Sequence, residues 1–195
     1  MRKCYAVLYS DDEFAFPVKQ EFDPYIQQEE DRDVHSFCWG CPQFFGGTLD
    51  DDETIVERLR DEISEESALS FTLLPGPLTL FYDARHEGNT YEFFCTRAWK
   101  PTDINWPSEA SWRLLPARYR EMCWVGGANR TAFAQLPVRP TQWDILQALI
   151  DAMPQNAPQW AIDQMVTYPV ERLAASQSAD AFDEFVRRWL ANELP

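Results

Sequence analysis

A glycine pair followed directly by an acidic, amphipathic segment is the feature that most constrains this chain of 195 residues. After Gly46 and Gly47, apolar side chains recur from Thr54 onward at the three- and four-residue spacing that lines one side of an α-helix. They are Ile55, Val56, Leu59 and Ile63. The spacing predicts a helix over residues 52–66 with one buried face, so the rest of the chain has to supply an apolar surface for it.

Three glutamates lie beside that predicted buried face. At about 100° per residue, Glu62, Glu65 and Glu66 fall within an arc of about 100°. Like charges about 4 Å apart repel by roughly 1 kcal/mol in water, and more in a cleft. A divalent cation removes the repulsion, and hard oxygen ligands suit Mg²⁺ or Mn²⁺. The alternative is a solvated helix face, which is the commoner use of an acidic run.

The spacing of the whole segment resembles the Nudix box. That family's pattern is Gly, five residues, Glu, seven residues, and then Arg-Glu-apolar-any-Glu-Glu-any-Gly-apolar. Here Gly47 is followed after five residues by Glu53, and after seven more by the stretch 61–69. The first glycine, every glutamate and both apolar positions match, the last being Leu69. Two positions differ, because Asp61 replaces the family's Arg and Ala68 replaces its closing Gly.

The resemblance implies an α/β (α+β) fold, an α/β/α sandwich with a mixed sheet and a helical C-terminal extension. It also implies Mg²⁺- or Mn²⁺-dependent hydrolysis of a diphosphate linkage in a nucleoside diphosphate derivative. Carried over by position, the implied metal ligands are Glu62, Glu65, Glu66 and the carbonyl of Gly46, with Glu53 as an accessory carboxylate. A small-molecule nucleotide derivative is therefore the expected partner.

The general base is expected among the glutamates. Glu65 is one candidate, and Glu87 and Glu109 are others in loops that follow the motif. The set expected to be catalytic is Glu62, Glu65 and Glu109. In the resembled family the Arg at the position of Asp61 holds the carboxylates in register. Because Arg58 lies one turn before Glu62, it is expected to replace that Arg in part through an i,i+4 pair.

A second reading belongs to a different class of protein. The two departures from the box favour a Nudix-like scaffold that has lost turnover and binds a protein partner or a nucleotide through its acidic surface or cleft. Signatures of other catalytic classes do not occur: the sequence has no P-loop, no Gly-x-Ser-x-Gly and no His-Glu-x-x-His.

Composition limits the partners further. The chain has 17 basic and 32 acidic residues, a net charge of −15, which disfavours binding of nucleic acid over a broad surface. A homodimer or a basic protein partner remains open. There is no apolar run of the ~20 residues needed to span a membrane and no export signal, so we expect a cytoplasmic protein. Its cysteines, including the Cys38-x-x-Cys41 pair, are then expected to be packed thiols rather than zinc ligands.

The other segments predict a sheet and C-terminal helices. The expected strands are Lys3–Tyr9 paired with Phe14–Val18, a meander of Phe71–Leu74, Leu78–Tyr82 and Thr90–Trp99, and Glu121–Val125 ended by Gly126 and Gly127. Residues 1–140 are expected to form the sheet domain and 141–195 helices that pack on it. The last helix carries Phe182, Phe185, Val186, Trp189 and Leu190 on one face, either to close the core or to make a dimer contact.

Overall fold

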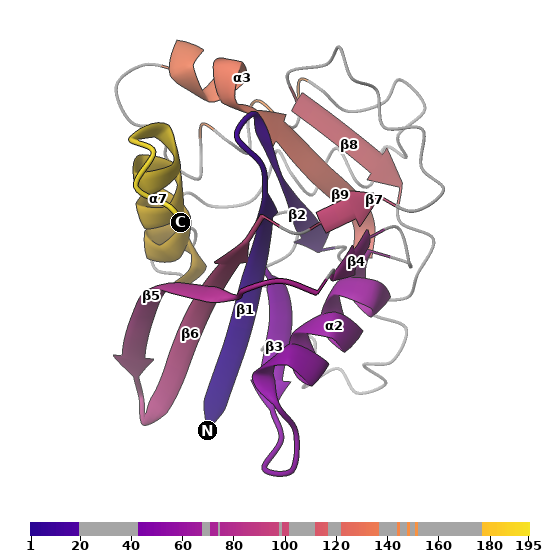
Figure 1. The fold of residues 1–195 in the computed structure, drawn as a ribbon, viewed down its shortest axis with the longest axis vertical. Coiled ribbons are helices and arrows are strands. Elements are labelled where there is room, and N and C mark those ends of the chain that lie inside the picture. The colour runs from indigo at the N-terminus through magenta and orange to yellow at the C-terminus, as the bar shows by residue number, and fades with distance from the viewer. Residues whose placement is uncertain are drawn as a thin grey trace.

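A mixed sheet runs through the centre of the computed structural model, which describes residues 1–19, 43–67, 71–73, 75–97, 99–101, 112–116, 122–136, 144, 148, 151 and 177–195. Strand β1 (Arg2–Tyr9) is parallel to β6 (Asn89–Thr96) on one edge. Its other edge is shared: β3 (Phe45–Leu49) pairs antiparallel with its first part and β2 (Glu13–Lys19) with its last residues. Strand β3 is therefore a branch of the sheet that pairs with β1 outside the main strand order (Figure 1).

The outer strands complete an order of β5-β6-β1-β2-β9-β8, with β3 branching from β1. Strand β5 (Thr79–His86) forms a hairpin with β6, whose turn places Glu87 and Gly88 at positive φ. On the far side, β9 (Met122–Asn129) pairs with β2 and with the edge strand β8 (Trp112–Pro116). Helix α3 (Arg130–Gln135) follows β9 directly.

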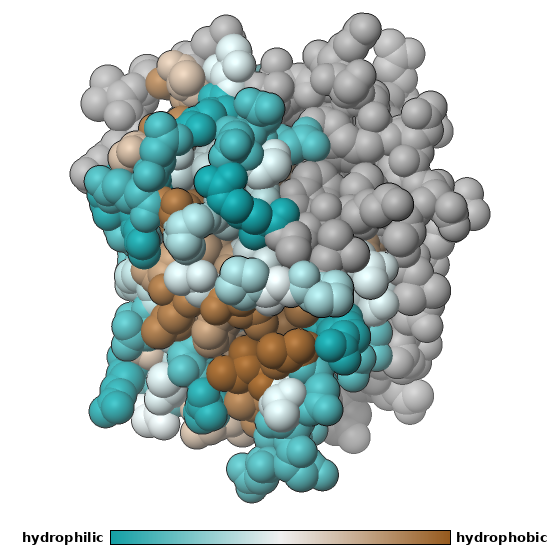
Figure 2. All heavy atoms as spheres, viewed as in Figure 1, coloured by the Kyte–Doolittle hydropathy of each residue, from teal (hydrophilic) through white to brown (hydrophobic). Residues whose placement is uncertain are grey.

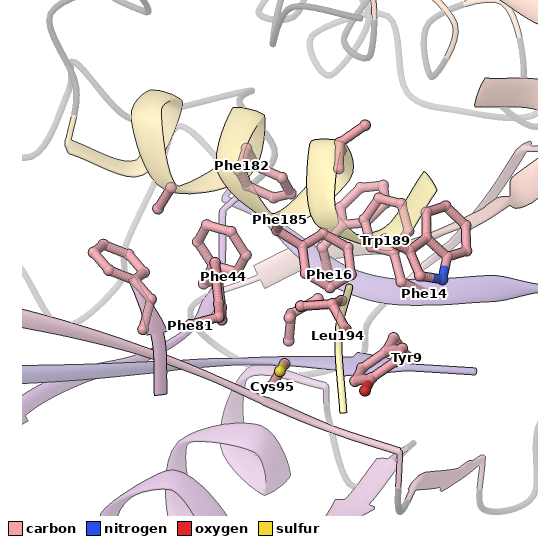
Figure 3. Packing of buried hydrophobic residues seen from close by; sticks show 14 of the residues in the cluster. Tyr9, Phe14, Phe16, Phe44, Phe81, Cys95, Phe182, Phe185, Trp189 and Leu194 are labelled. Atoms are coloured by element: carbon pink, nitrogen blue, oxygen red, sulfur yellow. The ribbon is translucent and has the colours of Figure 1, made fainter. Parts of the chain in front are cut away.

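Two apolar cores lie on opposite faces of this sheet because successive side chains of β1 alternate. Cys4, Ala6 and Leu8 belong to the core under α2 (Ile55–Glu66). Val7 and Tyr9 belong to the core under α7 (Gln177–Leu190). Figure 3 shows α7 on one side of the strands and α2 on the other. The predicted α/β/α sandwich with a mixed sheet is therefore confirmed.

Helix α7 closes the larger core with aromatic side chains. Phe182 stacks on Phe44 with ring centroids 4.0 Å apart, and Phe185 and Trp189 meet Phe14 at 5.2 and 5.3 Å (Figure 3). The guanidinium of Arg130 donates to the carbonyl oxygens of Trp189 and Leu190, which lack partners inside the helix. Of the two uses expected for this amphipathic helix, the structure shows burial in the core.

Several expected elements are wrong in detail. Strand β4 (Phe71–Leu73) does not join β5 in a meander but pairs with β7 (Trp99–Pro101) in a separate two-stranded sheet. It does so because Phe71 and Leu73 are buried in the core under α2. Strand β9 does not end at its glycine pair, since both glycines keep backbone partners in β2 and β8. Strand β8 and helix α3 were not expected.

Some predictions lie outside the described residues. They concern Cys38, Cys41, Ala68, Leu69 and Glu109, and most of the helices expected over 141–176, of which the described Asp144, Ala148 and Asp151 are helical. Within the part of the chain that the structure describes, no helix is long and apolar enough to cross a membrane. The cytoplasmic location stays a prediction.

Candidate active site

The start of α2 is fixed by a capping box. The hydroxyl oxygen of Thr54 accepts a hydrogen bond from the backbone N–H of Glu57 at 3.3 Å, and Glu57 Oε2 accepts from the backbone N–H of Thr54 at 3.0 Å. These two bonds satisfy donors that a helix N-terminus leaves without partners. The Thr-x-x-Glu pattern in the sequence is the signal for this cap. The helix begins at Ile55, so the expected start at residue 52 is wrong.

The end of α2 is tied to β4. Ser67 Oγ donates to the carbonyl oxygen of Ile63 and accepts from the backbone N–H of Phe71 at 3.0 Å. Ser67 is fully buried, so this connection is protected from water. With both ends fixed, the angle at which α2 presents each side chain to the sheet is also fixed.

The buried face of α2 contains carboxylates as well as apolar side chains. Leu59 and Ile63 are fully buried, and Glu62 and Glu66 are each only 5% exposed. Glu65 is exposed because it lies about 100° around the helix from Glu66. The structure thus divides the three predicted ligands, with two turned toward β3 and one toward solvent. Val56, expected on the buried face, is 43% exposed in the first turn.

The glycine pair of β3 receives the two buried carboxylates. The backbone N–H of Gly46 donates to Glu66 Oε2 at 2.9 Å. Gly46 has a φ of +143°, and a Cβ there would collide with the carbonyl oxygen of Cys4, so both backbone geometry and space require glycine. At Gly47 a Cβ would collide with Glu62 Oε1. A side chain is therefore excluded at Gly46 by the backbone of β1, and at Gly47 by the carboxylate of Glu62 as long as it points inward.

An ion pair lies against Gly47. The guanidinium of Arg58 contacts Glu62 Oε1, and their side chains are 28% and 7% exposed. Burial alone would lower the pKa of Arg58, but the charges of Glu62, then of Glu53 and Asp50, together raise it. The guanidinium is therefore permanently charged. The i,i+4 pair expected between Arg58 and Glu62 is present in the structure.

Glu53 lies in the loop before α2, and its charge acts on Arg58. It lines a pocket of about 410 Å³ at the ends of β1, β3 and β6, together with Met1, Arg2, Leu49, Asp50, Asp51, Gly88 and Thr90. Figure 2 shows the β3–α2 loop as a hydrophilic projection at the lower end of the molecule. Among the described residues, Glu53 Oε2 and Arg58 Nε are buried atoms without a hydrogen-bond partner.

Cys4 lies beneath the site and was not singled out from the sequence. It pairs with Gly47 across β1 and β3 and is fully buried. Burial raises the pKa of its thiol to about 11, with a smaller opposing effect of Arg58 and a further rise from Glu62. The alternation of small and apolar residues along β1 was the signal that could have placed Cys4 on the α2 face.

The predicted site residues are brought together only in part. Glu62, Glu66, Gly46 and Arg58 meet at the glycine pair, whereas Glu65 is exposed and Glu109 is not described. Glu87 is 81% exposed in the β5–β6 turn. In the described ranges, no three His, Cys, Asp or Glu side chains are arranged so that they could hold a metal ion. The contact from Gly46 to the site uses its N–H, and the ligand role of its carbonyl stays a prediction.

A mixed sheet between two helices, with the box residues on β3, its loop and α2, defines a Nudix-like fold. No family model matches the sequence, and no curated protein matches it significantly. Three solved structures are similar to the chain in shape. A MutT NUDIX hydrolase from Burkholderia pseudomallei has 16% identity and a TM-score of 0.40, with 84% of this chain and 95% of that chain covered.

The other two structures are about equally distant. A structure described as an ADP compounds hydrolase has 12% identity and a TM-score of 0.41, with 85% of this chain and 69% of that chain covered. A NUDIX hydrolase from Nitrosomonas europaea has 15% identity and a TM-score of 0.38, with 87% of this chain and 93% of that chain covered.

Proposed function

We propose that the protein is a Nudix-type hydrolase that uses Mg²⁺ or Mn²⁺ to cleave a diphosphate linkage in a nucleoside diphosphate derivative. The observation that carries the proposal is the burial of Glu62 and Glu66, one helical turn apart, against Gly46 and Gly47. Burying ionised carboxylates is costly unless a counter-charge and hydrogen bonds compensate them. A helix that served only to cover the sheet would carry apolar residues at these two positions.

The residues at this site fit a divalent cation in their chemistry. Carboxylate oxygens are hard ligands of the kind that Mg²⁺ and Mn²⁺ take in proteins. The buried Glu53 Oε2 has no hydrogen-bond partner among the described residues, so an oxygen is available close to the ion pair. Glu65 is exposed beside the two buried glutamates, where a change of rotamer would bring its carboxylate to the same edge of α2.

A bound cation would polarise a phosphoryl oxygen and lower the pKa of an attacking water. The chain's own residues would position the metal ligands and take the proton from the attacking water. Gly46 orients the Glu66 carboxylate through its N–H. Glu65, exposed to solvent, is the candidate to take the proton of the water, and Glu109 is the alternative from a later loop. Because the protein carries a net charge of −15, an anionic substrate depends on the cation for its approach.

A second candidate function is that of a Nudix-like binding protein without turnover, which holds a nucleotide or a protein partner. The observation that favours it is the state of the three helix glutamates. Glu62 is already paired with Arg58, and Glu65 is exposed. The described residues contain no group of three acidic, His or Cys side chains arranged to hold a metal ion. The two functions predict opposite results in a turnover assay.

The test is hydrolysis of a panel of ADP-ribose, dinucleotides and nucleoside triphosphates with Mg²⁺ and with Mn²⁺. Turnover of one substrate class is expected, and it should fall by about 100-fold in Glu66→Gln, since a misplaced ligand impairs both metal binding and orientation. The matched control is Asp61→Asn, which removes the same charge at an exposed position of the same helix. Binding of a panel member without turnover would favour the second function, and equal turnover in both variants would place the chemistry elsewhere.

A further inference from the structure

The ion pair between Arg58 and Glu62 occupies the place where the proposed function needs a metal ligand. Glu62 Oε1 faces both the guanidinium and the α-carbon of Gly47, and a Cβ on Gly47 would lie 3.1 Å from Arg58 Nη2. The ion pair is thus packed directly against the backbone of β3 at Gly47. A cation that approaches this oxygen of Glu62 meets Arg58 first.

Arg58 is the counter-charge of a wider group of acids. Besides Glu62, the carboxylates of Glu53 and Asp50 act on its guanidinium, and both belong to the loop between β3 and α2. An arginine in such surroundings keeps its proton, so its charge leaves Glu62 only if the side chain moves. Arg60, the other arginine of α2, is exposed and lies about 200° around the helix from Arg58, on the side away from this group.

The position of Arg58 permits such a movement. Its side chain is 28% exposed, so the guanidinium borders solvent on one side, whereas the Glu62 side chain is only 7% exposed and stays in place. The Nε of Arg58 lacks a hydrogen-bond partner among the described residues, so those contacts secure only one end of the guanidinium. Glu53 Oε2 is also without a partner there. An acceptor for the released arginine is therefore already present in the acidic loop.

We propose that Arg58 is a tethered cation that holds Glu62 in the metal-free protein, and that a divalent metal ion binds by displacing Arg58 from Glu62 toward Glu53. The inference rests on the proposed metal site and adds a positioning residue that regulates it. Before metal binds, Arg58 prevents repulsion between the buried carboxylates. Once displaced, it pairs with the loop carboxylate and holds the β3–α2 loop against the helix.

The first test is Mn²⁺ affinity, measured by the loss of free-ion electron paramagnetic resonance signal in the full chain. Because Arg58 competes with the ion, Arg58→Gln should bind Mn²⁺ about tenfold more tightly than the wild type, a factor typical of a change next to a metal ligand. Arg60→Gln removes the same charge from the same helix and should change the affinity less than about twofold, as expected for an exposed, screened charge. Equal effects of the two substitutions, or weaker binding in Arg58→Gln, would overturn the inference.

The second test follows Arg58 itself in the wild-type protein, so it does not depend on how a variant folds. The guanidinium resonances of Arg58, assigned by comparison with Arg58→Gln, should shift as Mg²⁺ saturates the site, and the shift should differ in Glu53→Gln. If Mg²⁺ binds and these resonances stay in place, Arg58 is not displaced and the inference is wrong, while the metal site stands. If neither the wild type nor Arg58→Gln binds either ion, the metal-dependent function fails together with the inference. Binding by Arg58→Gln alone would show that the ion does not displace Arg58 in the native chain, which overturns the inference and also contradicts metal-dependent hydrolysis by the native chain.

Discussion

The α-carbon of Gly47 lies against the carboxylate of Glu62, so closely that a single added methyl group would collide with Oε1. The glycine that opens the box therefore has a steric reason in this chain that is independent of backbone conformation. It allows β3 and α2 to approach while a charged side chain lies between them. The effects on stability of substitutions at Glu62 and at Gly47 should consequently be coupled.

Gly47→Ala should destabilise the protein by about 1–3 kcal/mol, because the added methyl group overpacks a filled site. Chemical denaturation would measure the change. In a Glu62→Ala background the same substitution should cost at least about 1 kcal/mol less, since the colliding oxygen is gone. The control is Gly88→Ala, where nothing lies within 4 Å and only the φ of +79° opposes a side chain. The cost of that control should be the same with and without Glu62.

Binding of Mg²⁺ or Mn²⁺ should stabilise the folded protein, because the unfolded chain has no assembled carboxylates. At a free metal concentration about 100 times the dissociation constant, the gain is about 2.7 kcal/mol, which a thermal melt detects readily. Glu66→Gln should lose most of this gain, since Glu66 is one of the two glutamates buried at the glycine pair. A melting temperature that millimolar metal leaves unchanged in the native protein would count against the metal site.

The sequence was sufficient for the helix and for the Arg58–Glu62 pair, because both follow from angular spacing along one element. It was not sufficient to tell which of Glu62, Glu65 and Glu66 turn inward. That choice depends on where β3 lies relative to α2, a contact between segments that no local pattern encodes. For the same reason the pairing of β4 with β7, which depends on burial under α2, was missed.

Asp61→Arg restores the charge that the Nudix box has at this position. Asp61 is exposed, so its charge is screened from the buried pair and the change should raise or preserve turnover, by no more than about fivefold. The measurement is kcat/KM on the substrate that the panel identifies, with Asp61→Asn as the neutral intermediate. Loss of activity in Asp61→Arg, with activity kept in Asp61→Asn, would give this position a role of its own and would contradict our account.

Cys4 and Cys95, one on each face of the sheet, are both free and buried thiols. Burial raises the pKa of each from 9.0 to about 11, so the protonated thiol is the form that the folded protein favours. Under native conditions at pH 8, peptide mass spectrometry after treatment with iodoacetamide should therefore find both residues unmodified. Modification should appear only once a denaturant exposes them.

The same two shifts predict how stability depends on pH in the alkaline range. Between pH 9 and 11 the unfolded chain loses protons from these thiols while the folded chain keeps them, so the free energy of unfolding falls as pH rises through this window. Below pH 9 the contribution is fully present, and above about 11 it is lost. Each thiol accounts for roughly 3 kcal/mol, since its pKa rises by about two units and one unit corresponds to about 1.4 kcal/mol. Burial also raises the pKa of Tyr9, which acts with the same sign. The thiol contribution is isolated by the difference between the wild type and Cys95→Ala, and a difference that stays constant from pH 8 to 11 would show that Cys95 titrates in the folded protein as it does in the unfolded chain.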